Sequence, residues 1–321
     1  MPRTRHHTGR PGRTAGRTTG RTTGRTAGHT TRRRMLRREV PSTVGLLADA
    51  GDFAAMRGYR SFTFDRHDDY TDYLRHVDGL LRSLAAQGIH TSVALFDPEE
   101  YAGFCTEHGI DADTSEGRSR FTAELAGAGT VLPYTGQPID ELVPLLVDEA
   151  VRQATWEYAT TLLAGVGSCA DCGEDIGHAS FARATGTLSR LVDGAGPGHH
   201  HLVCSVPTQD EQLVAVLHAE VTTDRDRPAR IEGRESLDFV SVLAAGLALG
   251  GPGGLVLRST TEGLPDRVHG WRLDRGRLVP LSAAAVFNAY CTDVDTGDPV
   301  APEPGVEYCP GYEVDDPTPH H

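Results

Sequence analysis

Hydrophobic side chains recur at three- and four-residue steps in two long stretches of the first half of the chain. In residues 73–84 these positions form one helical face, and Gly88 is expected to end the helix. A second stripe follows Pro138 and runs to about Gly165, with Pro144 inside it as the expected cause of a kink or of a later start. Both stretches are predicted to be helices with one buried face.

Shorter apolar runs surround these helices. Three of them are typical of strands, namely residues 59–64 (YRSFTF), 90–96 (HTSVALF) and 130–134. Asp97 is expected to cap a helix with Pro98 at its first position, and another helix is expected over residues 115–126. The order of strand, helix and strand favours an α/β unit whose first two strands are parallel.

The second half of the chain has a different pattern. A short helix is expected after His178, followed by two paired strands, HLVCSV and LVAVLHAEV, with residues 207–211 as their turn. Residues 237–249 are expected to form a buried helix. The sequences GLVLRST, RVHGWRL and RLVPLS then predict an antiparallel meander, and a last helix is expected over residues 283–290.

These elements predict an α+β fold in two domains. Residues 41–167 are expected to form an α/β domain, and residues 168–310 an antiparallel α+β domain with a candidate zinc knuckle. Residues 1–40 and 311–321 are expected to be a disordered arm and a disordered tail, because neither segment has the apolar side chains to form a core.

Composition and charge exclude several classes of protein. The best candidate for a membrane segment, residues 239–249, is far shorter than the ~18 apolar residues that a spanning helix needs. The chain contains no lysine, and residues 41–321 carry nineteen arginines against 43 acidic residues, a balance that repels nucleic acid. Without an apolar signal segment, the six cysteines are expected to lie in a reducing cytoplasm.

The first forty residues carry the opposite charge. They contain twelve arginines and one acid, Glu39, and they repeat the pattern R-T-x-G. One interpretation is a basic arm that associates with nucleic acid in a salt-dependent way. The alternative is that translation starts at Met35 or Met56 and that the arginine-rich segment is upstream sequence of low complexity.

The strongest chemical signal is CADCG, in which two residues separate Cys169 from Cys172. Two thiolates at this spacing can hold one zinc ion from a tight turn, and Gly173 allows the left-handed backbone that such a turn uses. Zinc needs two further ligands, and the downstream HLVC supplies His201 and Cys204. The predicted site is a structural zinc centre with Cys169, Cys172, His201 and Cys204 as ligands.

The fourth ligand of this site stays open. On a straight strand His201 and Cys204 point to opposite faces, so His178 is the alternative partner of Cys204. His199 and His200 are further candidates. A catalytic disulfide is the other chemistry of a Cys-x-x-Cys pair, but the two acidic residues that follow the pair oppose thiolate formation.

A second cluster of candidate ligands surrounds the start of the first predicted helix. It consists of His67, Asp69, Asp72 and His76, of which the last three fall near one helical face. Such a cluster is compatible with a metal-dependent hydrolase. The alternative is a solvated flank beside the leucine stripe.

Four stretches, CADCGEDIGHASF, HLVCSVP, RVHGWRL and FNAYCTD, resemble conserved actinobacterial proteins of unknown function, in the lysine-poor style of Streptomyces. The resemblance covers residues 41–315 and implies a cytoplasmic bacterial protein, but no activity or substrate. The sequence therefore favours a cytoplasmic protein that holds structural zinc and binds or regulates a partner, either a protein or a small ligand. A metal-dependent hydrolase and nucleic-acid association through the arm are the alternatives.

Overall fold

The computed structural model describes residues 42–64, 67, 69–128, 131–222, 229–231, 233–293 and 296–314. These residues form eight helices and two mixed sheets, which confirms the predicted α+β class. The chain divides into two compact units, residues 1–142 (unit 1) and 143–321 (unit 2). The division falls inside the helix α6 (Ile139–Gly165), whereas the sequence placed it near Gly167. The arginine-rich arm, residues 1–40, lies outside the described residues.

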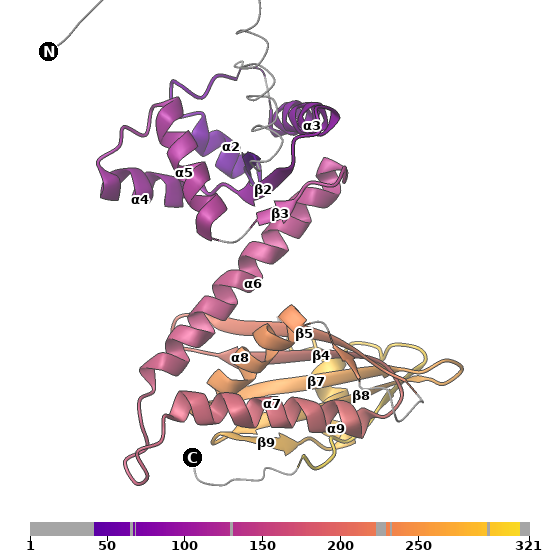
Figure 1. The fold of residues 1–321 in the computed structure, drawn as a ribbon. Coiled ribbons are helices and arrows are strands. Elements are labelled where there is room, and N and C mark those ends of the chain that lie inside the picture. The colour runs from indigo at the N-terminus through magenta and orange to yellow at the C-terminus, as the bar shows by residue number, and fades with distance from the viewer. Residues whose placement is uncertain are drawn as a thin grey trace, which may run out of the picture. The chain divides into compact units, whose positions relative to one another are not determined.

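Unit 1 contains a three-stranded sheet with the order β1-β2-β3. Its strands are β1 (Ser42–Leu46), β2 (Thr91–Leu95) and β3 (Val131–Pro133), and its helices are α2 (Ala50–Met56), α3 (Tyr70–Ala86), α4 (Pro98–His108) and α5 (Ser115–Ala128) (Figure 1). β1 and β2 are parallel, with Val44 opposite Val93, and β3 is antiparallel to β2. Helix α5 contacts both β1 and β2.

Local side-chain chemistry sets the helix starts in unit 1. The carboxylate of Asp97 accepts hydrogen bonds from the N–H groups of Glu99 and Glu100, and Pro98 is the first residue of α4, as predicted. Helix α3 begins with a capping box between Asp69 and Asp72 and ends before Gly88, whose φ is 69°.

The strand predicted over residues 59–64 is wrong. These residues form turns and bends, and the strand parallel to β2 is β1. The reason is aromatic packing, because the ring centroids of Phe62 and Phe64 lie 6.0 and 5.5 Å from that of Phe53 in α2. Tyr73 of α3 completes this cluster at 5.6 Å from Phe64. The rings therefore gain more from meeting each other on a loop than from joining a sheet.

Unit 2 contains a larger sheet with the order β10-β8-β7-β4-β5-β6, and β9 pairs with residues 271–274 of β8. Its strands are β4 (Gly198–Pro207), β5 (Gln212–Val221), β6 (Arg230–Ile231), β7 (Gly253–Thr260), β8 (Asp266–Asp274), β9 (Arg277–Pro280) and β10 (Val306–Tyr308). Its further helices are α7 (Ile176–Ala195), α8 (Gly233–Leu249) and α9 (Ala283–Tyr290). All strand pairs are antiparallel except β10 with β8, so the predicted hairpin and meander are confirmed.

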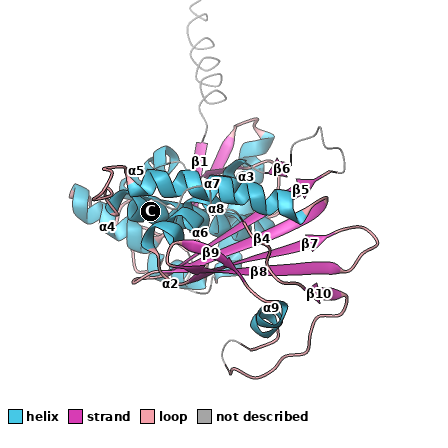
Figure 2. Cartoon of the chain, turned by 90° about the horizontal axis from the view of Figure 1, so that it is seen from below, coloured by secondary structure: helices cyan, strands magenta, loops and turns pink. Residues whose placement is uncertain are grey.

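The core of unit 2 lies between one face of this sheet and the helices α7 and α8, which pack side by side (Figure 2). Alternate residues of β4 enter the core, among them Leu202, Cys204 and Val206. Trp271 of β8 lies in the same core and is only 1 % exposed. Helix α9 contacts β8.

The last described residues pack onto this core, although the sequence predicted a disordered tail from residue 311. The hydroxyl of Tyr312 donates to the carbonyl of Leu191 in α7, and the indole Nε1 of Trp271 donates to the carbonyl of Tyr312 at 2.8 Å. Gly194 leaves room for the ring, because a Cβ there would lie 2.5 Å from Cε2 of Tyr312. Residues 315–321 lie outside the described part of the chain.

His200 gives unit 2 an acid-sensitive core position. Its side chain is buried, with Nε2 2.8 Å from the carbonyl of Gly196 and Nδ1 3.0 Å from Oγ of Ser259. Since the carbonyl can only accept, the neutral ring donates from Nε2 and accepts from the Ser259 hydroxyl at Nδ1. Burial lowers the pKa of His200 below its ordinary value of 6.5.

We expect His200 to make unit 2 less stable as the pH falls. A histidine whose pKa is depressed in the folded state contributes fully above its unfolded pKa of 6.5, and this contribution is lost as the pH drops through the folded value. Urea unfolding at about pH 7.5 and about pH 5 should therefore show a smaller loss for His200→Gln than for the wild type. The exposed neighbour His199→Gln should behave like the wild type, and an equal loss in all three proteins contradicts the expectation.

Candidate functional site

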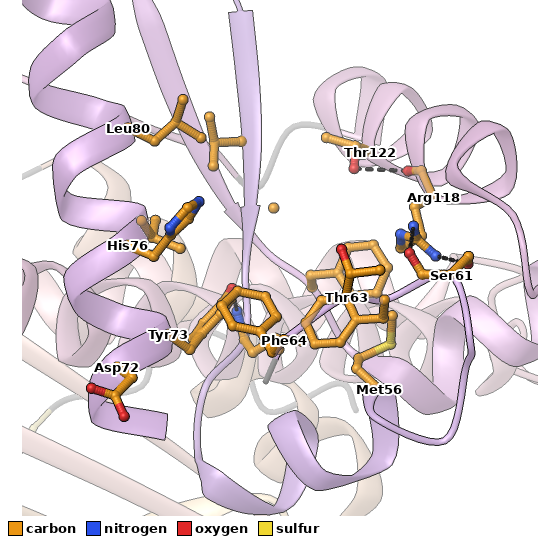
Figure 3. A pocket seen from close by; sticks show the side chains of 16 residues that line it. Met56, Ser61, Thr63, Phe64, Asp72, Tyr73, His76, Leu80, Arg118 and Thr122 are labelled. Atoms are coloured by element: carbon orange, nitrogen blue, oxygen red, sulfur yellow. Dashed lines mark hydrogen bonds between the residues drawn. The ribbon is translucent and has the colours of Figure 1, made fainter. Parts of the chain in front are cut away.

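A cavity of about 1000 Å³ lies in unit 1 between α3 and α5 (Figure 3). Helix α3 contributes Tyr73, His76 and Leu80 to one side, while α5 contributes Arg118 and Thr122 to the other. Strand β1 borders the cavity with Val44 and Gly45, among other residues. Much of the apolar surface is aromatic, and it comes from Phe62, Phe64, Tyr73 and Phe96.

Arg118 contributes a guanidinium group to this cavity. Ser61 and Phe62 hold this group in place. Its Nη1 donates to Oγ of Ser61 at 2.7 Å and its Nη2 to the carbonyl of Ser61 at 2.9 Å, while its guanidinium carbon lies 6.0 Å from the centroid of the Phe62 ring. Within the described ranges Arg118 forms no ion pair, although a guanidinium has five N–H donors. Arg118 therefore has donors left for an anion.

Ser61 is also held from its other side. Its N–H donates to the carboxylate of Asp113 at 2.7 Å, and this hydrogen bond holds the pKa of Asp113 below its usual range. The same residue thus receives a hydrogen bond from Arg118 and gives one to Asp113, so the loop that carries Phe62 and Phe64 is anchored on α5 and on the residues before it. The aromatic side of the cavity is preorganised by these contacts.

The acids of the predicted hydrolase cluster serve the start of α3. Asp69 accepts from the N–H of Asp72 at 3.0 Å, and Asp72 accepts from the N–H of Asp69 at 3.2 Å. The Asp69 N–H, together with Arg75, holds the pKa of Asp72 below its ordinary value. His67 is exposed in a turn, whereas Asp72 and His76 line the cavity. The structure therefore brings Asp72 and His76 to one site, but Asp69 and Asp72 form the capping box of α3.

The cavity residues do not form a catalytic pair. Among the residues that the structure describes, no hydrogen bond joins His76 to a hydroxyl or carboxylate of the cavity, and no three His, Cys, Asp or Glu side chains form a group that could hold a metal ion. A hydrolase needs a nucleophile in contact with a base or an activated metal-bound water. The arrangement offers binding groups and lacks both of these features.

The four predicted zinc ligands are separated. His201 and Cys204 both lie on β4, but the alternation of the strand exposes His201 and buries Cys204 completely in the core of unit 2. Burial raises the pKa of the Cys204 thiol to about 12, which keeps it protonated. Cys169 and Cys172 lie in the turn between α6 and α7. These residues do not fit one shared zinc ion, and the zinc content of the protein stays a prediction.

His201 belongs instead to a second cavity, of about 600 Å³, which His199, His200 and His218 also line. The rings of His201 and His218 stack with centroids 4.8 Å apart, and Nδ1 of His218 lies 3.2 Å from a carboxylate oxygen of Glu235. Partial burial and the neighbouring His218 lower the pKa of His201. The alternative zinc ligand His178 is exposed in the first turn of α7.

Sequence reasoning missed Arg118, Ser61 and Phe96. One signal for Arg118 is present in the sequence, because Arg118, Phe121 and Thr122 are spaced by three and four residues, so they share a face of α5. Phe121 is buried, so Arg118 lies on the buried face of α5. A charged side chain on such a face needs a partner or a ligand to offset the loss of hydration.

Residues 31–137, a third of the chain, match the family model of a domain of unknown function, DUF8829. This segment contains all the residues that line the cavity of unit 1. No curated protein and no solved structure matches the chain. In the described ranges, none of the helices combines the length and the apolar composition of a segment that crosses a bilayer.

Proposed function

We propose that unit 1 is a ligand-binding domain for a small amphipathic molecule with an aromatic or apolar body and one anionic group. The observation that carries this proposal is the position of Arg118, which has unused donors at an aromatic-lined cavity in the segment that the domain match covers. Binding or regulation by a small ligand fits this site better than catalysis, since the cavity has no nucleophile–base pair among the described residues.

The size and lining of the cavity support a compact organic ligand. Its volume of about 1000 Å³ is at the upper end of the range for small-molecule pockets. Phe62, Phe64 and Phe96 offer ring faces and edges for a flat or branched apolar body, and the exposed Leu80 extends this surface to the cavity mouth.

The charges of the cavity support an anionic group on that ligand. The acid that lines the cavity, Asp72, is engaged by the Asp69 N–H and by Arg75. Arg118 lies opposite, on α5, and its planar guanidinium suits a carboxylate, sulfonate or phosphate oxygen pair. His76 adds a second group that can donate a hydrogen bond. A structural zinc ion, predicted from the sequence, is not required for this site.

The test compares two fluorescent probes that share one apolar body. 1-Anilinonaphthalene-8-sulfonate carries an anion, and N-phenyl-1-naphthylamine is its uncharged counterpart. We expect Arg118→Gln to weaken binding of the sulfonate about tenfold or more and to leave binding of the neutral probe within about twofold, because a hydrogen bond to a charged group contributes about 1.5–3 kcal/mol. Fluorescence titration of the full chain measures both.

Arg120→Gln is the matched control. Arg120 lies on the same helix but pairs with Glu116 on the exposed side, so its replacement should change neither titration. Equal loss of both probes in Arg118→Gln would mean that Arg118 only supports the loop, and an unchanged sulfonate titration would mean that no anion meets Arg118. Either result overturns the proposed function.

A further inference from the structure

The cavity of unit 1 lies at the free edge of β1. The sheet order places β1 at one end, next to β2, and of the described strands of this unit β1 alone lines the cavity, through Val44 and Gly45. Val93 and Ala94 are adjacent in β2, point to opposite faces and are both 0 % exposed, so both faces of the sheet are covered. Helices α3 and α5 lie on opposite sides of the cavity (Figure 3). The cavity therefore occupies the place beside β1 where a further covered strand would lie.

Gly45 directs its backbone polar groups towards this space. In a parallel pair, a residue bonds to its neighbouring strand through both N–H and C=O, and alternate residues do so. The N–H of Ser42 donates to the carbonyl of His90 at 2.9 Å. The carbonyl of Leu46 accepts from the N–H of Phe96 at 2.8 Å, so the even-numbered residues of β1 face β2. The N–H and C=O of Gly45 therefore point to the free edge, and within the described part of the chain neither has a hydrogen-bond partner.

The free edge is closed two residues further on. The N–H of Leu47 donates to the hydroxyl of Tyr73 at 3.1 Å, and the carbonyl of Leu47 accepts from the hydroxyl of Tyr70 at 3.0 Å. Both tyrosines belong to α3, so this helix already satisfies the edge groups of Leu47. An added strand that pairs with Gly45 cannot continue past this point, and a chain end suits the position better than the middle of a long segment.

The carboxyl end of a peptide carries the groups that this cavity can bind. Its last residues bring a backbone N–H and C=O, an apolar side chain and a free carboxylate. Gly45 offers its backbone groups and Arg118 its guanidinium. The rings of Phe62, Phe64 and Phe96 offer apolar surface. We propose that the cavity binds the C-terminal end of a peptide with an apolar or aromatic last residue, which adds to β1 as a short fourth strand.

The close approach of Phe96 to Gly45 joins the apolar and the backbone parts of this site. A Cβ at Gly45 would lie 2.8 Å from Cδ2 of Phe96, so glycine lets the ring lie against the strand edge. One residue of a peptide can therefore pair with Gly45 and place its side chain against Phe96. This inference rests on the proposed function, because it names the class of amphipathic anion that the cavity takes.

The first experiment measures binding of the peptide acetyl-Ala-Val-Ala-Phe to the full chain by calorimetry, as the free acid and as the C-terminal amide. We expect the acid to bind about tenfold or more tightly than the amide, because the amide removes the charged acceptor. In Arg118→Gln this difference should fall to within about twofold. Arg120→Gln, whose exposed arginine pairs with Glu116, is the matched control and should retain it.

The second experiment tests strand pairing with two further free acids, methylated on the amide nitrogen of the last or of the second-last residue. Adjacent residues of a strand direct their N–H groups to opposite sides. One of the two methyl groups should therefore weaken binding about tenfold, while the other should change it by about twofold or less. This contrast between neighbours distinguishes a paired strand from a peptide that is held by its side chain alone.

Three results would refute the peptide as the ligand. Equal binding of the acid and the amide means that the carboxylate does not meet Arg118. Equal effects of the two methyl groups mean that the peptide does not pair with β1. A peptide that does not bind, while the sulfonate probe still depends on Arg118, means that the cavity takes a ligand other than a peptide, and the proposed function then stands. If the sulfonate titration does not depend on Arg118, both proposals fall together.

Discussion

Replacement of Trp271 by alanine is expected to lower the free energy of unfolding of unit 2 by about 3–5 kcal/mol, the range for deleting a large buried aromatic side chain. The indole is 1 % exposed, it meets the Tyr312 ring edge-to-face at a centroid distance of 4.9 Å, and its Nε1 donates to the Tyr312 carbonyl. Alanine leaves a cavity and also leaves that carbonyl without its donor. Urea unfolding of the full chain, followed by far-ultraviolet circular dichroism, measures the loss.

Two further variants separate the causes of this loss. Trp271→Phe keeps a ring in the core but removes the Nε1 donor, so its loss should be smaller than that of the alanine variant. Val216→Ala, at an exposed position of β5, should change stability by about 0.5 kcal/mol or less. A loss below about 1 kcal/mol for Trp271→Ala would contradict the position of Trp271 in the core.

Gly177→Ala is expected to destabilise unit 2 by about 1–3 kcal/mol, although alanine is the better helix former. Gly177 is buried in the first turn of α7, and a Cβ there would lie 2.4 Å from the carbonyl oxygen of Leu163 in α6. The Cβ is attached directly to the backbone and the atom it meets is a backbone carbonyl oxygen, so no side chain can rotate away, and α6 and α7 must separate. Thermal and urea unfolding of the variant should both show the loss.

Gly186→Ala is the control for this prediction, because it makes the same change in the same helix. The atoms nearest to a Cβ at Gly186 belong to the flexible guanidinium of Arg190, the first of them at 3.3 Å. Helix propensity then decides the outcome, and we expect a gain of about 0.5–1 kcal/mol. If the two variants shift stability in the same direction and by the same amount, the close approach of α6 to Gly177 is contradicted.

Much of the fold could be predicted because its signals are local. Asp97 followed by Pro98 predicts the start of a helix from adjacent residues. The alternation of apolar and polar residues in β4 and β5 predicts both the hairpin and its buried face. The left-handed turn at Gly173 is equally local. The strand predicted over residues 59–64 is wrong for the opposite reason. The position of its aromatic rings depends on contacts with Phe53 and with α3, which are not local in the sequence.

The candidate site could be predicted only in part. The sequence indicates Asp72 and His76 as candidate residues and both line the cavity, but their spacing does not distinguish a helix cap from a metal ligand. Arg118 could not be assigned to the cavity from the sequence, because its partner Ser61 lies 57 residues earlier in the chain. His201 and Cys204 lie on opposite faces of β4, because side chains alternate along a strand. This alternation, which the sequence already indicates, is the argument against their sharing one zinc ion.

The packing of Tyr312 against α7 and Trp271 also has a consequence for biosynthesis. Unit 1 ends at residue 142, so its parts are all present early in translation, and domains commonly fold in that order. The residues that cover Trp271 include Tyr312, which is translated after both α7 and β8, the two elements that it contacts. A nascent chain that stalls before this point would expose a large aromatic side chain to chaperones and proteases.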